Sequence, residues 1–445
     1  MRLAVPLLLA CLTLSSLAPP ALAQEHPTVQ QLRAMLGPNA SMSFARATAL
    51  PAPAEGVTLD EVVITRDGQR GTIASLSLSG LRPNGVASLI ARDLVSPSPE
   101  GPLRIGRIAL ADLVGYRRTD GSDPQPDDVK LRELVLEEVR IPGRPAITFG
   151  RLTLNAYGLG QRSSGEVVEL AVSGIPDNPV EGMSLGRLAF AGMDLAGLAS
   201  AAAAQRGPGA QPTGRQSVTL DSLALAGGGE TLGGIANLTI EGEVNAQGSG
   251  NGRFALRGLS AERTALSAPF LAMLGLDRLE ASLTFDGSYD AAAGRLVVPA
   301  FALGLREVGA LALALGMDGW TAEMAQSQDP SRLRLLDARL RYADQSLYRR
   351  VVRNEAARLG GSEQAVRDQH AQIVGGLLTA GRPDPAMDSL REVLLRFIRG
   401  QINVVELQAS PRAPVPVMGL AAAAQQGPAG IIRQLGLTAR GDSQP

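Results

Sequence analysis

The chain has 445 residues, of which 45% are hydrophobic and only 3% are aromatic, and its formal net charge is -1. A large core can therefore be built from aliphatic side chains. The near-neutral charge argues against polyanionic partners, and the scarcity of aromatic rings argues against glycan or nucleic-acid recognition. The length suits two to four ordinary domains or one long repeat array.

The first 23 residues have the layout of a secretory signal peptide. Arg2 supplies the positive charge, an apolar stretch runs from Leu3 to Leu17, and Ala21-Leu22-Ala23 forms a small-x-small cleavage site. Cys11 is the only cysteine, so the mature chain would hold no disulfide, which is ordinary for a bacterial periplasmic protein. We expect a periplasmic protein with no transmembrane helix after cleavage; the alternative is a lipoprotein anchored at Cys11.

The next part of the chain predicts a linker followed by a long β region. Residues 24–56 are the linker, with a short helix candidate at Val29–Leu36. Apolar and polar residues then alternate from Val57 onward, which predicts a β-strand repeat domain over residues 57–342. Three stretches interrupt or blur this pattern: 86–94 (strand or short helix), 199–214 (flexible loop or helical turn) and 267–274 (helix).

A short motif recurs within this β region: an apolar residue, Gly-Arg, Leu or Ile, any residue, then Leu or Phe. The three copies are Ile105-Gly106-Arg107-Ile108-Ala109-Leu110, Phe149-Gly150-Arg151-Leu152-Thr153-Leu154 and Leu185-Gly186-Arg187-Leu188-Ala189-Phe190, and looser copies begin at Leu131 and Leu220. The spacing is near-regular and suits two-strand units with variable loops. A glycine weakens a strand, so we expect it to mark a bulge or a close approach of the backbone.

The C-terminal part changes to helical spacing, which predicts a helical region over residues 343–437 with one strand near 402–409. We expect this region to cap the open end of the sheet. Residues 438–445 are predicted to be a disordered tail. The fold class is therefore mainly β: an extended curved antiparallel β-repeat sheet with a C-terminal helical cap.

Few residues in the sequence could carry catalysis. The chain has two histidines, His26 and His370, and no cysteine after cleavage, so a zinc site or cysteine catalysis is not expected. Gly182-Met183-Ser184-Leu185-Gly186 matches a nucleophile-elbow pattern, but it lies within a predicted strand instead of a strand-to-helix turn. Asp120, Asp123, Asp127 and Asp128 share one loop without a calcium-loop spacing. We expect no enzymatic activity, no cofactor and no metal.

The run of short strands over residues 57–342 resembles the repetitive β proteins of Gram-negative envelopes, the AsmA/TamB-like group. This resemblance implies an envelope location and a repetitive sheet. That group is anchored by an N-terminal membrane helix, whereas this chain carries a cleavable signal, so a role in bridging membranes is not implied. The tail from Phe397-Ile398-Arg399-Gly400 to Pro416 is similar to the end of uncharacterised exported proteobacterial proteins.

The repeat suggests where a ligand would bind. A groove that holds lipid or acyl chains would be lined by the apolar ends of the repeats: Leu110, Leu154, Phe190 and Leu225. Arg107, Arg151 and Arg187 recur at one position and could meet anionic head groups, or each could pair with a neighbouring acid. An alternative function is a scaffold that binds another envelope protein, and a hydrolase is a third, less supported hypothesis.

Overall fold

The computed structural model describes residues 26–443, apart from 37–39, 53, 67, 116–123, 206–211, 265–266, 322–323, 325–328, 380–384 and 426–427. The chain forms two compact units, one of residues 1–212 with 216–230 and the other of residues 213–215 with 231–445. The described residues contain 20 strands, and every pairing between them is antiparallel. The fold is mainly β with helices at its C-terminal end, as predicted. The predicted signal peptide and Cys11 lie outside the described residues.

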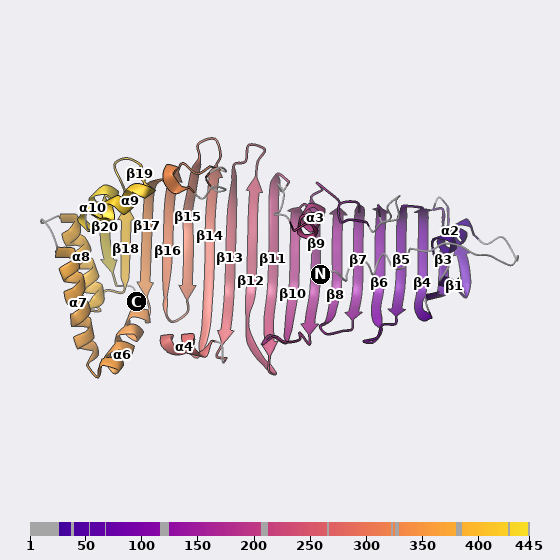
Figure 1. The fold of residues 1–445 in the computed structure, drawn as a ribbon, viewed down its shortest axis with the longest axis horizontal. Helices are drawn as coiled ribbons and strands as arrows, with labels where there is room; N and C mark the ends of the chain where they lie inside the picture. The colour runs from indigo at the N-terminus through magenta and orange to yellow at the C-terminus, as the bar shows by residue number, and fades with distance from the viewer. Residues whose placement is uncertain are drawn as a thin grey trace. The chain divides into compact units, whose positions relative to one another are not determined.

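The first unit is a meander in which each strand pairs with the next one in the chain (Figure 1). Two short strands, β1 and β2, both pair with β3 at one edge. A helix, α2, packs on β3 and β4. The elements are α2 (Pro27–Met35), β1 (Ala40–Ser43), β2 (Arg46–Ala49), β3 (Gly56–Arg66), β4 (Gln69–Arg82), β5 (Gly85–Ser96), β6 (Leu103–Val114), β7 (Leu131–Ile141), β8 (Ala146–Tyr157), β9 (Ser163–Ser173), β10 (Gly182–Met193), α3 (Leu195–Ala203) and β11 (Gly214–Gly227).

The second unit continues the same plan and ends in helices (Figure 1). Strand β18 pairs with β17 and with β20, and helices α8 and α10 pack on this end of the sheet. The elements are β12 (Glu230–Val244), β13 (Gly250–Glu262), α4 (Ala268–Leu274), β14 (Arg278–Asp290), β15 (Arg295–Leu305), β16 (Gly309–Asp318), the 3-10 helix η1 (Pro330–Arg332), β17 (Arg334–Asp344), α6 (Leu347–Leu359), α7 (Glu363–Thr379), α8 (Pro385–Ile398), β18 (Val404–Ala409), β19 (Val415–Pro416), α9 (Val417–Gln425), α10 (Pro428–Leu435) and β20 (Leu437–Asp442).

In two stretches the structure differs from the sequence-based expectation, and in a third it decides between two alternatives. The predicted linker contributes α2 and the two edge strands, because Val29, Leu32 and Met35 on α2 are buried against the sheet. Residues 86–94 are strand β5. The predicted disordered tail is wrong for residues 438–442, which form β20 paired along its length with β18, since an unpaired β18 would leave its backbone groups unsatisfied.

The strands of the first unit share a backbone kink, and the glycines of the Gly-Arg motif lie at the level of this kink. Glu61, Asp93, Glu138, Glu169 and Ser222 have left-handed backbones with φ between 51° and 58°, and they lie on alternate strands β3, β5, β7, β9 and β11. Gly106 lies opposite Glu138, because Ile105 pairs with Val139 and Arg107 pairs with Glu137. A Cβ on Gly106 would lie 3.0 Å from the Cβ of Glu138. Gly150 and Gly186 face Glu169 and Ser222 in the same way.

The kink decides which side chains share a face. Strict alternation would place residues i, i+2 and i+4 together. In β6 the buried residues are Ile105, Ile108, Leu110 and Leu113, so the spacing is three, two, three. The extra step at Gly106 brings the three apolar positions of the motif onto one face. The expected close approach at the motif glycine is therefore confirmed.

The left-handed backbone of Glu138 leads to a prediction about the free energy of unfolding. A left-handed backbone costs a residue with a side chain roughly 1–2 kcal/mol, whereas glycine adopts it freely at an entropic cost of about 0.5–1 kcal/mol. We expect Glu138→Gly to leave the free energy of unfolding unchanged or raise it by up to about 1 kcal/mol. The measurement is the urea unfolding midpoint and slope.

The matched control is Glu133→Gly, an exposed glutamate on the same strand that is not in the left-handed region. This change should lower the free energy of unfolding by about 0.5–1 kcal/mol, because it only adds backbone entropy to the unfolded chain. Equal losses in the two variants would show that the Glu138 backbone stores no strain.

Candidate functional site

The apolar face of the first unit consists of rows that cross the strands. Leu110, Leu154 and Phe190 belong to one row, as the register shows: Leu110 pairs with Leu134, Leu134 with Leu154, Leu154 with Gly165, and Gly165 with Phe190. The structure therefore brings together three of the four residues that the sequence proposed as groove lining.

Leu225 lies on the same face but in another row. It pairs with Met183 near the start of β10, whereas Phe190 lies near the end of that strand. The reason is strand direction: β11 runs antiparallel to β10, so the last residue of its looser motif copy lies at the opposite end. The sequence copies alone do not show which strands are reversed.

Burial on this face changes along the unit. From β3 to β7 its side chains form one buried cluster with α2, and Leu110 is only 4% exposed. From β8 to β11 the side chains on this face are half-buried, apart from the buried Leu185. The half-exposed set, which sequence reasoning did not single out beyond Leu154, Phe190 and Leu225, includes Leu152, Val167, Leu188, Val218, Leu220 and Leu223. Its only signal in the sequence is the two-and-three spacing of apolar residues.

Gly165 shapes this half-exposed part. A Cβ at this position would lie 2.5 Å from the carbonyl oxygen of Thr153 and 2.6 Å from the ring of Phe190. The Phe190 ring therefore lies over the glycine and occupies the space where a side chain of β9 would project. An aromatic side chain packed across a strand glycine is a recognised way to fix register.

The three arginines lie on the opposite face. Arg107 and Ile108 are neighbours in a regularly paired strand, so their side chains point to opposite sides of the sheet. The register places Arg107, Glu137 and Arg151 in one row, which continues through Val168 to Arg187 and Asp221. The repeat thus does form an arginine row, but this row cannot meet the head group of a ligand that lies among the leucines.

Each arginine in the row has an acidic neighbour. Arg107 lies 3.3 Å and Arg151 3.8 Å from carboxylate oxygens of Glu137. Arg187 contacts Glu166 and lies 3.6 Å from Asp221. Hydrogen bonding and charge attraction from Glu166 hold the pKa of Arg187 above its usual value. These contacts agree with the pairing alternative for the row.

The residues considered for catalysis have structural contacts. Ser184 is the third residue of β10 and is paired with Ala171 and Ala224 on the neighbouring strands, so it is not on a strand-to-helix elbow. His370 lies between Tyr348 and Glu355, with nitrogen–oxygen distances of 3.1 and 3.0 Å, and joins α6 to α7. Within the described ranges, no group of three or more His, Cys, Asp or Glu residues is placed to hold a metal ion. Asp120 and Asp123 of the acidic loop lie outside those ranges.

The second unit also has a row of apolar side chains across its strands, and helices bury the apolar side chains of its last strands. Phe254, Phe285, Phe301 and Leu313 pair in sequence across β13 to β16. At the other end of the unit, α8 and α10 bury Val405 and Ala439 of β18 and β20 in a cluster. No helix in the described part of the chain combines the length and apolar character needed to cross a bilayer.

We predict that the ion pairs of the arginine row stabilise the fold only slightly and that this effect decreases at high salt. Arg187→Gln should lower the free energy of unfolding by about 0–1 kcal/mol at low salt, because exposed ion pairs are weak. The difference should shrink in 1 M NaCl, where the screening length falls to about 3 Å. Arg140→Gln, an exposed arginine for which the described contacts include no ion pair, is the control and should show no salt-dependent difference in urea unfolding.

One part of the chain is similar to a known family. Residues 302–442, from β15 to β20, match a family described as "Uncharacterized protein". No curated protein matches the chain. The matched segment contains the helices that pack on the end of the second unit.

Proposed function

We propose that this chain is a non-enzymatic β-repeat protein of the bacterial periplasm that binds lipid acyl chains on the apolar face of β8 to β11. The observation that supports it most is the change in burial along one continuous face. The rows are buried from β3 to β7, and the same rows continue as half-exposed leucine, valine and phenylalanine side chains on β8 to β11. A contiguous apolar surface that is only half-buried is a candidate for a binding site.

The composition of the face favours an acyl chain over a protein partner. Protein interfaces depend on tryptophan, tyrosine and arginine anchors. On β8 to β11 the face carries aliphatic residues with Phe149, Tyr157 and Phe190, and the arginines of the motif are on the other side. A flexible hydrocarbon needs only apolar area, at about 25 cal/mol per Å² removed from water.

The three arginines lie on the opposite face and already have carboxylate neighbours, so we do not expect them to recognise a lipid head group. Any anionic head group of a bound lipid would have to be recognised at the ends of the strands or remain in water. The proposal therefore predicts little selectivity among phospholipid head groups and a preference for longer acyl chains.

The test compares two neighbouring residues on β10. Phe190→Asp places a charge on the apolar face, whereas Ala191→Asp makes the same change at an exposed position on the opposite face. The full chain, purified from a periplasm, is analysed by native mass spectrometry and lipid extraction. We expect phospholipid with the parent chain and with Ala191→Asp, and at least a tenfold loss with Phe190→Asp.

Folding is checked by circular dichroism in each variant, and Leu188→Asp serves as a second half-buried position on the same face. A folded, lipid-free parent chain would contradict the proposal. Equal lipid content in Phe190→Asp and Ala191→Asp would also contradict it. Either result would leave a scaffold that binds another envelope protein as the better function.

A further inference from the structure

Helix α6 is strongly basic, although the whole chain has a formal net charge of only -1. Its 13 residues, Leu347–Leu359, include four arginines and one acid, Glu355, so the helix has a formal charge of +3. The arginines are Arg349, Arg350, Arg353 and Arg358. The helix belongs to the second unit and packs against α7 and α4 (Figure 1).

The apolar side of α6 and its one acid are directed toward α7. Val352 and Ala356, which are one helical turn apart, form a buried cluster with Val366 of α7. A carboxylate oxygen of Glu355 lies 3.0 Å from Nε2 of His370, which is also on α7. The negative charge of α6 is therefore on the side that faces its neighbour.

The arginines of α6 lie on its outer side. Arg349, Arg353 and Arg358 are exposed, whereas Arg350 is half-buried and donates to groups within the fold. Arg353 lies 3.4 Å from a carboxylate oxygen of Glu363. Among the described contacts, no hydrogen bond or ion pair involves Arg349 or Arg358. These two guanidinium groups are therefore free to meet an external anion.

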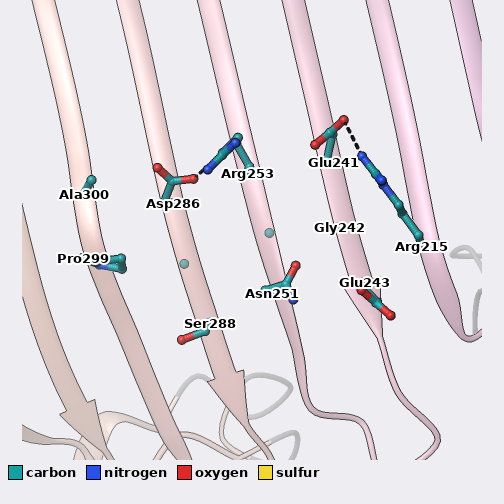
Figure 2. A pocket seen from close by; sticks show the side chains of 12 residues that line it. Arg215, Glu241, Gly242, Glu243, Asn251, Arg253, Asp286, Ser288, Pro299 and Ala300 are labelled. Carbon is teal, nitrogen blue, oxygen red and sulfur yellow. Dashed lines mark hydrogen bonds and ion pairs between the residues drawn. The ribbon is translucent and has the colours of Figure 1, made fainter.

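Arginines on the sheet of the same unit have a different environment. Arg215 lies 3.1 Å from a carboxylate oxygen of Glu241, and Arg253 lies 2.7 Å from one of Asp286 (Figure 2). On these strands an acid on the neighbouring strand balances each of the two charges. The positive charge on the outer side of α6 is not balanced in this way.

Exposed apolar side chains accompany these arginines. Val351 is 46% exposed and lies seven residues before Arg358, so both project from one side of α6. On α7, Ile373 and Leu377 are 51% and 62% exposed. They follow Val366 by seven and eleven residues, which is two and three helical turns, so they continue the side of α7 that packs on α6.

We propose that the outer side of α6, with Ile373 and Leu377 of α7, docks on a bilayer that contains anionic phospholipids. The negative potential of such a surface attracts each arginine near it, and guanidinium groups bind phosphate oxygens with two hydrogen bonds. Exposed aliphatic side chains beside the cations can enter the head-group region, as they do in interfacial helices. The charge of the bilayer is complementary to that of α6.

The outer side of α6 fits a bilayer better than it fits an acidic protein. Protein interfaces depend on buried tryptophan, tyrosine and arginine anchors. The one aromatic residue of α6, Tyr348, is turned inward, where its hydroxyl lies 3.1 Å from Nδ1 of His370 and its ring packs on Phe397. The surface thus offers charge and aliphatic side chains without an aromatic anchor.

The experiment is flotation of the full chain with vesicles of phosphatidylcholine, either alone or with about 30% phosphatidylglycerol. At about 50 mM NaCl we expect at least tenfold stronger partition onto the anionic vesicles, and this preference should disappear at about 1 M NaCl, where the screening length is about 3 Å. Equal partition onto the two kinds of vesicle would overturn the proposal. Absence of binding to both would also overturn it and would favour an acidic protein as the partner.

A matched pair of double variants locates the binding. Arg349→Gln with Arg358→Gln should weaken partition onto anionic vesicles about thirtyfold, which corresponds to about 1 kcal/mol for each arginine. The control, Arg257→Gln with Arg334→Gln, removes two charges from exposed positions on β13 and β17 and should bind like the parent chain. Equal losses in the two variants would overturn the assignment to α6, as would unchanged binding of the α6 variant.

Two further variants test the apolar part and separate this proposal from the acyl-chain site. Val351→Ser with Ile373→Ser should weaken partition at least fivefold, because two aliphatic side chains would no longer leave water. Unchanged partition would overturn the inclusion of these side chains in the docking surface. Phe190→Asp, which disrupts the proposed acyl-chain site, should still float with anionic vesicles, so either proposal can fail without the other. Circular dichroism checks the folding of each variant.

Discussion

The first unit depends on one backbone constraint: a left-handed residue on every second strand, opposite a residue with little or no side chain on the strands between. Glu138 and Gly106 show the reason, since a side chain on the glycine would collide with the glutamate. The pairing remains one to one across this point, so no residue is expelled from the sheet. The kink nevertheless shifts the alternation of side chains by one position. The apolar residues on both sides of the kink stay on one face because this shift occurs at the same level in each strand, and a second left-handed residue, such as Asp112 in β6, accounts for the later step from Leu110 to Leu113.

The kink also separates the chemistry of the two faces. In Ile105-Gly106-Arg107-Ile108, the charged residue lies beside two apolar ones in sequence, yet it lies on the opposite side of the sheet from both. One face thus carries hydrocarbon, and the other carries alternating arginine and acid. A ligand that needs both hydrophobic contact and charge recognition does not fit on either face.

Much of this architecture could be predicted from the sequence, and the failures have physical causes. Strand positions followed from alternation, and the glycine of the motif correctly indicated close backbone approach. The sequence could not show which face of the sheet carries Arg107 and which carries Leu110. A single left-handed residue on a neighbouring strand shifts the alternation of side chains between the two faces by one position. Glu138 carries no sequence signal for that conformation, which is more usual for glycine or asparagine.

Helices cover the apolar side chains of the terminal strands in both units. In the first unit α2 buries Val29, Leu32 and Met35 on the terminal strands, and in the second unit α8 and α10 do the same at β18 and β20. The chain thus provides cover where a terminal strand would otherwise expose its apolar side. On β8 to β11 the rows have the same composition, and the helix that follows β10 is the short apolar α3, whose Ala196 is buried. Apolar area left in water costs about 25 cal/mol per Å². The acyl chain proposed for β8 to β11 would remove such area from water on strands whose apolar side chains are half-buried.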